Sequence, residues 1–210
     1  CGVSCKTFLS TFTALELLNG TDLGLEKVAD IGLEKVADLG LLCFKFWLHF
    51  FYPKFTSELH YECELVLKID KVGKNIQEKF AHTYYSSFTL GIDFTARDLQ
   101  KKCKENGLPW EIAKSFDQSA PLSKHWMEIT DSAENITFEL EHNGVIVQKG
   151  FSQDMIFTFD QIIAYVSKFI TLKKGDLIFT GTPAGVGPIQ IGDHLKARLF
   201  DKEVLSFYVR

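Results

Sequence analysis

The chain has 210 residues, of which 46% are hydrophobic and 24% charged, a balance typical of a globular protein long enough to bury a core. Its net charge of -4, with no basic run longer than two residues, argues against nucleic acid as a partner. Neither a CxxC pair nor zinc spacing occurs among the five cysteines, Cys1, Cys5, Cys43, Cys63 and Cys103. We therefore expect reduced thiols and a cytoplasmic location, with the mitochondrial matrix as the alternative for a eukaryotic chain.

Residues 1–49 form an atypical N-terminal segment. It contains a tandem octapeptide, Leu23–Asp30 followed by Ile31–Asp38, and two copies are too few for a solenoid. The apolar stretch Leu39–Tyr52 is 14 residues long and includes a lysine and a histidine, so it is too short and too charged to span a bilayer. We expect neither a membrane segment nor a secretory signal in this part of the chain.

The next elements are a strand and a helix. Alternation with period two predicts a strand over residues 61–69. Thr95 and Asp98 resemble a capping box, which predicts a helix over residues 96–106 that ends at Gly107. On that helix, Arg97, Gln100 and Lys104 would share one face.

Strands dominate the remainder of the chain. The turn signal at Asn143-Gly144 predicts a hairpin between strands over residues 137–142 and 145–149. Asp160 is expected to cap a helix that ends at Phe169. Further strands are predicted over residues 177–180, 194–200 and 204–209. Because this order has many strands and few helices, we expect a β-rich α+β fold.

Two glutamates are the most informative feature of the sequence. In a strand, Glu62 and Glu64 would project from the same face, and two carboxylates so close repel each other unless a cation lies between them. A third acid, Asp93, directly precedes the segment that contains the predicted helix. Three carboxylates without a Cys or His cluster suit a hard divalent ion such as Mg2+ or Mn2+. The alternative, two solvated acids on an exposed strand, is favoured by spacing alone because the E-x-E pattern is common.

Residues from about 50 to 210 resemble the fumarylacetoacetate hydrolase family. Four motifs in the same order carry the resemblance: His60-Tyr61-Glu62-Cys63-Glu64, Gly91–Gln100, Gly107–Phe116 and Gly175–Gly187. The similarity is greatest to the small, single-domain, bacterial-type subgroup that includes acylpyruvate hydrolases and oxaloacetate decarboxylases. The resemblance implies that residues 50–210 form the catalytic domain. It also implies a mixed β-roll of the type found in the C-terminal domain of the family, and a homodimer.

The resemblance also implies roles for individual residues. Glu62, Glu64 and Asp93 would bind the metal, with Mg2+ as the expected ion and Mn2+ or Ca2+ as alternatives. The catalytic set would be Arg97, Gln100 and Lys114, and the substrate would contact Arg97, Gly181 and Thr182. Without the resemblance, Lys114 would be interpreted as a surface lysine. The glycine-rich stretch from Gly181, which lacks a P-loop signature, would be interpreted as a tight turn.

The implied function is that of a metal-dependent hydrolase or lyase acting on small 2-keto or 1,3-dicarbonyl acids. A metal-stabilised enolate would serve either C–C hydrolysis of an acylpyruvate or decarboxylation of oxaloacetate. Two different functions stay open beside it. One is that of a catalytically silent relative with a structural role, and the other is that of an isomerase of the 2-hydroxyhepta-2,4-diene-1,7-dioate type.

The N-terminal segment departs from the family pattern. Relatives usually carry a His followed three residues later by a Glu in an N-terminal lid, and that pair activates the hydrolytic water. No histidine occurs before His49 in this chain. We therefore expect acylpyruvate hydrolysis to be weak or absent, while metal binding and oxaloacetate decarboxylation or keto–enol tautomerisation persist.

Overall fold

The computed structural model describes residues 49–129 and 135–210. The tandem octapeptide and most of the apolar stretch 39–52 lie outside the described residues. Within the described part, no helix is long and apolar enough to cross a membrane.

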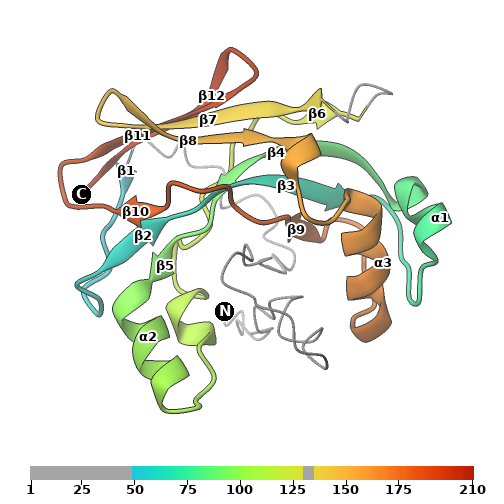
Figure 1. Cartoon of the computed structure of the whole chain (residues 1–210), viewed down its shortest axis with the longest axis horizontal. Coiled ribbons are helices and arrows are strands. Elements are labelled where there is room, and N and C mark those ends of the chain that lie inside the picture. Colours follow the sequence, from blue (N-terminus) through green and yellow to red (C-terminus); the bar gives the residue numbers. More distant parts are fainter. Residues whose placement is uncertain (1–48, 130–134) are drawn as a thin grey trace, which may run out of the picture.

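Three sheets build the molecule (Figure 1). The first has five strands in the order β1 (His49–Phe50), β12 (Lys202–Val209), β11 (His194–Leu199), β7 (Thr137–His142) and β8 (Val145–Phe151). The second has four, in the order β6 (Met127–Glu128), β4 (Tyr85–Ile92), β3 (Cys63–Ile69) and β9 (Leu177–Phe179). The third is small and consists of β10 (Gly187–Pro188), β2 (Leu59–Tyr61) and β5 (Thr95–Ala96). All strand pairs are antiparallel except β1 with β12.

The core lies between the five-stranded sheet and the sheet that contains β3. In β3, six of the seven residues are buried, so the strand is covered on both faces. Aromatic rings fill the space beside it: Phe50 stacks on Phe94 with ring centroids 4.2 Å apart, and Phe207 lies 6.2 Å from both. Phe94 follows Asp93 in the sequence, so this aromatic packing also anchors the loop that carries a candidate metal ligand.

The predicted hairpin is confirmed. Strands β7 and β8 pair directly, and His142 is opposite Val145. The two turn residues, Asn143 and Gly144, have φ angles of 51° and 85°. Positive φ at both positions is the geometry of a type I′ turn, which favours Asn-Gly because these residues tolerate a left-handed backbone.

The predicted capping box at Thr95 is wrong. Helix α2 (Arg97–Glu105) begins after Ala96 and has no side-chain cap. Thr95 belongs to β5, where it pairs with His60, so its backbone is committed to a strand. The carboxylate of Asp98 instead accepts hydrogen bonds from the backbone N–H groups of Ser57 and Leu99, both at 2.9 Å.

Asp160 does not cap its helix either. Helix α3 (Phe159–Phe169) is capped by Thr158, which accepts a hydrogen bond from the backbone of Gln161, and the Gln161 side chain accepts one from the Thr158 N–H. Asp160 lies one residue inside the helix and accepts from the Tyr85 hydroxyl at 2.9 Å. The prediction placed the cap two residues too late because Thr-x-x-Gln and the acidic first turn give overlapping signals.

The strands predicted near residues 177–180, 194–200 and 204–209 are present as β9, β11 and β12. Besides α2 and α3, the described part contains the short helix α1 (Glu78–Ala81), which packs beside α3 (Figure 1). The expected β-rich α+β class is confirmed.

Candidate metal and substrate site

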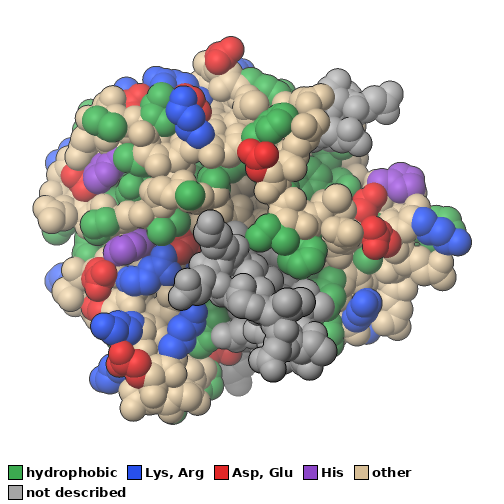
Figure 2. All heavy atoms as spheres, viewed as in Figure 1, with side chains coloured by type: hydrophobic (Ala, Val, Ile, Leu, Met, Phe, Trp, Pro, Cys, Tyr) green, Lys and Arg blue, Asp and Glu red, His purple; other side chains and the backbone are tan. Residues whose placement is uncertain are grey.

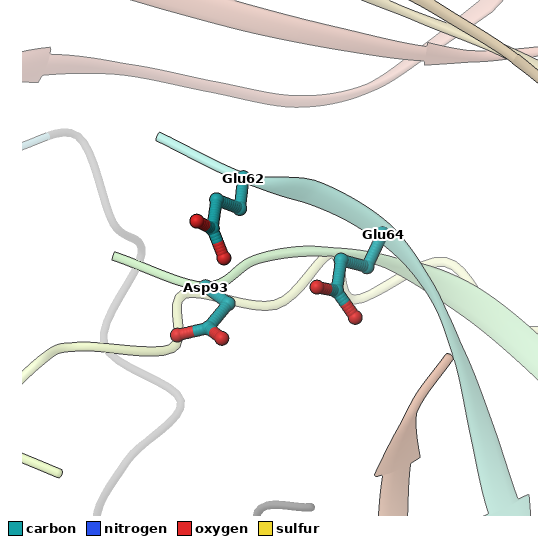
Figure 3. Close-up of side chains that lie close together, drawn as sticks. All are labelled: Glu62, Glu64 and Asp93. Atoms are coloured by element: carbon teal, nitrogen blue, oxygen red, sulfur yellow. The ribbon is translucent and has the colours of Figure 1, made fainter. Parts of the chain in front are cut away.

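The three acids meet where two sheets join. Glu62 lies between the end of β2 and the start of β3, and Asp93 directly follows β4. Strands β3 and β4 pair with Cys63 opposite Ile92, and the Asp93 N–H donates to the Glu62 carbonyl at 2.8 Å. This ladder brings residues far apart in the sequence to adjacent positions. Figure 3 shows the side chains of Glu62, Glu64 and Asp93 gathered around a common space.

All three carboxylates are inside the protein. The exposed fractions of Glu62, Glu64 and Asp93 are 2%, 0% and 1%, and one ligand oxygen from each lies within 4.8 Å of the others. Charged side chains of both signs are spread over the face in Figure 2, whereas these acids are withdrawn from the surface. The interpretation as two solvated acids is therefore excluded, and the mutual repulsion of the carboxylates in a poorly solvated space requires a cation.

Lys114 supplies one positive charge to this cluster. It follows the short 3-10 helix Glu111–Ala113 and is 1% exposed, so it is not a surface lysine. Its Nζ lies 2.6 Å from Glu62 Oε2 and 2.6 Å from Asp93 Oδ2. The buried ammonium group thus bridges two of the three candidate metal ligands.

Arg97 and Gln100 complete the polar wall from α2. The Arg97 guanidinium forms an ion pair with Glu62 Oε1 and donates to Gln100 Oε1 at 2.7 Å. Gln100 is 3% exposed, and its Nε2 has no hydrogen-bond partner within the described residues. A buried amide donor without a partner is costly, so this group is suited to bind an oxygen of a ligand.

The two glutamates differ in electrostatics. Burial alone would raise the pKa of Glu62, but the charges of Lys114 and Arg97 outweigh it and hold the pKa below its ordinary value. Burial and the negative charge of Asp93 raise the pKa of Glu64 well above its ordinary value, although Lys114 acts in the opposite direction. Burial opposes the charge on Lys114 too, yet Asp93 and Glu62 raise its pKa. The positive charges therefore neutralise one side of the cluster more fully than the other.

The residues fit a hard divalent cation. Carboxylate oxygens are the ligands that Mg2+ and Mn2+ prefer, and they outnumber the neighbouring cationic groups. Oε1 of Glu64 is buried and has no hydrogen-bond partner among the described residues, which leaves it available to an ion. Elsewhere in residues 49–129 and 135–210, no other group of three such ligands is close enough to hold a metal.

The Gly-Thr-Pro loop, residues 181–183, contacts the start of β3, which carries Glu64. The Gly181 N–H donates to Glu64 Oε2 at 2.7 Å, and the Thr182 hydroxyl donates to the Cys63 carbonyl at 2.9 Å. The structure thus places Gly181 and Thr182, the two loop residues predicted to contact the substrate, beside the acids, and their polar groups are directed at β3. Sequence reasoning missed Gln148, a buried residue of β8 that hydrogen-bonds both Cys63 and Thr182. No motif or spacing marks it, because its partners are distant in sequence.

A His-x-x-Glu spacing does occur once in the chain, at His125 and Glu128, far from the N-terminal segment. Both side chains are exposed, and Glu128 pairs with Ser87 in β4. At about 3.3 Å per residue, that register places Glu128 roughly 20 Å along β4 from Asp93. This pair therefore lies away from the three acids.

Comparison with known proteins identifies the family. The family model described as fumarylacetoacetate (FAA) hydrolase C-terminal matches residues 49–207. The chain belongs to the fumarylacetoacetate hydrolase family.

Members of this family with known names match most of the chain. A mitochondrial oxaloacetate tautomerase of Mus musculus is 42% identical over 159 residues, which cover 75% of this chain and 72% of the relative. An oxaloacetate tautomerase of Escherichia coli strain K12 is 42% identical over 145 residues, covering 68% of this chain and 66% of the relative. The crystal structure of a fumarylpyruvate hydrolase from Pseudomonas aeruginosa in complex with Mn2+ and pyruvate superposes with a TM-score of 0.73. It is 34% identical, and the match covers 78% of this chain and 70% of that one. The predicted family and fold are confirmed, and these relatives are enzymes.

Opposite effects on the metal-free protein are expected from two matched variants. Glu64→Gln raises the melting temperature in excess chelator, because a neutral amide replaces a carboxylate that is costly to ionise there. Since the folded pKa of Glu64 lies above its unfolded value, ionisation removes stability as the pH rises, so the gain is larger at pH 8 than at pH 5. Glu62→Gln lowers the melting temperature, because Lys114 and Arg97 lose a shared partner. Equal destabilisation by both variants in thermal unfolding would contradict this account.

Lys114→Met is expected to lower the unfolding free energy of the metal-free protein by about 3 kcal/mol, because Glu62 and Asp93 lose a buried counter-charge. Adding Mg2+ restores more stability to this variant than to the wild type, since the ion replaces the missing charge. The control is Lys149→Met, which breaks an exposed pair with Glu139 and costs less than about 1 kcal/mol. Denaturant unfolding with and without Mg2+ measures the unfolding free energy of each variant. If Mg2+ stabilised Lys114→Met no more than the wild type, the result would contradict the view that Lys114 and the ion neutralise the same carboxylates.

Proposed function

We propose that the protein is a metal-dependent enzyme that acts on small 2-keto or 1,3-dicarbonyl acids through an enolate, with oxaloacetate as the first candidate substrate. One observation carries the proposal: Glu62, Glu64 and Asp93 form one buried cluster of carboxylates, and Lys114 and Arg97 form ion pairs with two of its members, Glu62 and Asp93. A site that binds only a structural ion has no need of these further cations. An anionic substrate beside the ion does need them.

The relatives support the substrate class. Two are named oxaloacetate tautomerases, and the Pseudomonas aeruginosa hydrolase is described in complex with Mn2+ and pyruvate. Oxaloacetate and pyruvate share the 2-keto acid group, whose adjacent carboxylate and keto oxygens can chelate one ion. We infer Mg2+ as the resident ion of this chain, and Mn2+ or Ca2+ would suit the same oxygen ligands.

The ion and the side chains have separate tasks. A bound divalent ion would act as a Lewis acid that favours the enolate form of the substrate. Lys114 has three ammonium hydrogens, of which Glu62 and Asp93 take two, so one remains for a substrate oxygen. Arg97 presents a planar guanidinium that suits a carboxylate. The amide hydrogens of Gln100, which have no partner within the described residues, would orient a second oxygen. Lys114 and Gln100 act where water is largely excluded, whereas the Arg97 side chain is partly exposed.

Reactions that pass through an enolate without adding water are favoured over hydrolysis. Tautomerisation takes a proton from one atom, carbon or oxygen, and returns one to the other. Decarboxylation releases CO2 and leaves an enolate that then takes up a proton, whereas hydrolysis also requires a base that activates water. Two described histidines have acidic partners: His60 pairs with Glu58 and His142 with Asp193. Neither partner is one of the three candidate metal ligands. We therefore propose oxaloacetate tautomerisation or decarboxylation as the activity of the described part of the chain.

A silent role and an isomerase activity are less well supported. A silent relative would have no need of the buried Lys114 beside the acids, or of the buried Gln100 amide nitrogen, which has no partner in the described part of the chain. An isomerase of the 2-hydroxyhepta-2,4-diene-1,7-dioate type would use the same residues, so only a substrate comparison separates it. The homodimer implied by the family stays a prediction. So does the compartment, for which the mouse relative, named as mitochondrial, supports the mitochondrial alternative.

Turnover tests the proposal. We expect optical assays to show loss of the oxaloacetate enol that depends on Mg2+, with slower loss of acetylpyruvate. In the double variant Glu62→Ala, Glu64→Ala, the oxaloacetate rate falls on the order of 100-fold or more, because two of the three carboxylate ligands of one ion are removed. The control, Glu105→Ala with Glu203→Ala, removes two exposed carboxylates and leaves the rate unchanged. A protein that binds Mg2+ and turns over neither acid would favour the silent relative.

A further inference from the structure

Strand β9 stops pairing with β3 before it reaches the two glutamates. The last paired residues are Phe179 and Val66, and Thr180 adds one more backbone hydrogen bond, to the Leu65 carbonyl at 3.1 Å. At Gly181 the chain turns with a φ of +101°, which only glycine adopts readily. Cys63, which lies between the two glutamates, therefore has no backbone partner on this side of β3 among the residues that the structure describes.

The side chain of Gln148 takes the place of the missing strand. Its Oε1 accepts from the Cys63 N–H at 3.0 Å, and its Nε2 donates to the Thr182 hydroxyl at 2.8 Å and to the Pro183 carbonyl at 2.9 Å. The Thr182 hydroxyl in turn donates to the Cys63 carbonyl at 2.9 Å. These bonds form a closed ring through which one amide and one hydroxyl satisfy both backbone polar groups of Cys63.

Burial makes this ring costly to break. Gln148 is 1% exposed and Cys63 is 0% exposed, so water is not at hand to replace a lost partner. A glutamine amide carries both an acceptor and two donors, and all three take part here. The only hydrogen of the Thr182 hydroxyl is used within the ring, so this group can accept from a ligand but has no hydrogen to donate.

The residues that follow the Gly-Thr-Pro loop, up to Gly187, pack on β8 and β2. A Cβ added to Gly185 would lie 2.0 Å from the Val147 carbonyl oxygen, so this part of the chain rests on the backbone next to Gln148. Gly187 pairs with Tyr61, and an added Cβ there would lie 2.7 Å from the tyrosine hydroxyl. The segment from Gly181 to Gly187 is thus held at both ends, and Gln148 ties its beginning to Cys63 at the start of β3, between Glu62 and Glu64.

We propose that Gln148 is a positioning residue for the metal site: by replacing a strand partner at Cys63, it fixes the peptide between Glu62 and Glu64 and seats the Gly181–Pro183 loop. The Gly181 N–H that bonds Glu64 Oε2 belongs to this loop, so the orientation of one ligand depends on the same ring. Residues that orient metal ligands typically change metal affinity by 10- to 100-fold when removed. This inference rests on the metal site of the proposed function.

Mn2+ affinity, measured by electron paramagnetic resonance on the full chain, tests the proposal. Gln148→Met keeps the side-chain length and removes all three hydrogen bonds, and it weakens Mn2+ binding by about 10-fold or more. Thr182→Val weakens binding while Thr182→Ser, which retains the hydroxyl, restores it. The double variant Gln148→Met, Thr182→Val binds Mn2+ about as weakly as the weaker of the two single variants, because both changes break the same ring. The control is Gln153→Met, the same substitution at an exposed residue, and it leaves the affinity unchanged.

Hydrogen exchange separates failure of this inference from failure of the proposed function. In the metal-free protein, Gln148→Met accelerates exchange of the Cys63 amide and of residues 181–182, while the centre of β3 stays protected. A wild type that binds no Mn2+ overturns the proposed function and the role of Gln148 as a positioning residue together. If Mn2+ binding is unchanged in folded Gln148→Met and Thr182→Val, the role of Gln148 is overturned while the proposed function stands. The same holds if the free-energy losses of Mn2+ binding in the two single variants add fully in the double variant.

Discussion

The repulsion among three buried carboxylates is the constraint on which the rest of the site depends. Glu62, Glu64 and Asp93 are withdrawn from water, and such a cluster persists only where positive charge compensates it. Lys114 and Arg97 compensate Glu62 directly, whereas one oxygen of Glu64 has no partner within residues 49–129 and 135–210, and the pKa of Glu64 is raised. Negative charge therefore stays uncompensated on the side of Glu64, where a divalent ion would neutralise it. This explains why the site combines carboxylates with Lys114 and Arg97.

The fold meets this constraint with long-range contacts. The β3–β4 ladder sets Asp93 beside Glu62, and the stacked rings of Phe50 and Phe94 fix the loop after β4. The polar groups that face the acids come from three separate segments: α2, the turn after residues 111–113, and the loop at Gly181. No single segment could form the site, so binding of an ion and a substrate depends on the packing of the whole described domain.

Local patterns predicted part of this arrangement. The Asn143-Gly144 turn predicted the hairpin, because a turn depends on neighbours in sequence. Period-two alternation predicted one strand over residues 61–69; the structure interrupts it at Glu62, between β2 and β3, although the side chains of Glu62 and Glu64 still lie together. Helix caps at Thr95 and Asp160 were predicted wrongly, because strand pairing at Thr95 and the competing Thr158 override the local signals. The proximity of Asp93 and Lys114 was implied only by the family resemblance. Gln148 was missed altogether, because its role arises from where β9 ends.

The central claim is that the three acids form one divalent-cation site that also receives a keto acid. The most direct measurement is a Mn2+ titration of the chelator-treated wild type by electron paramagnetic resonance, repeated with pyruvate present. We predict one bound Mn2+ per chain, displaced by Mg2+, whose spectrum changes when pyruvate is added. Absence of bound Mn2+, or binding that persists when Glu62 and Glu64 are both replaced by alanine, would contradict the account.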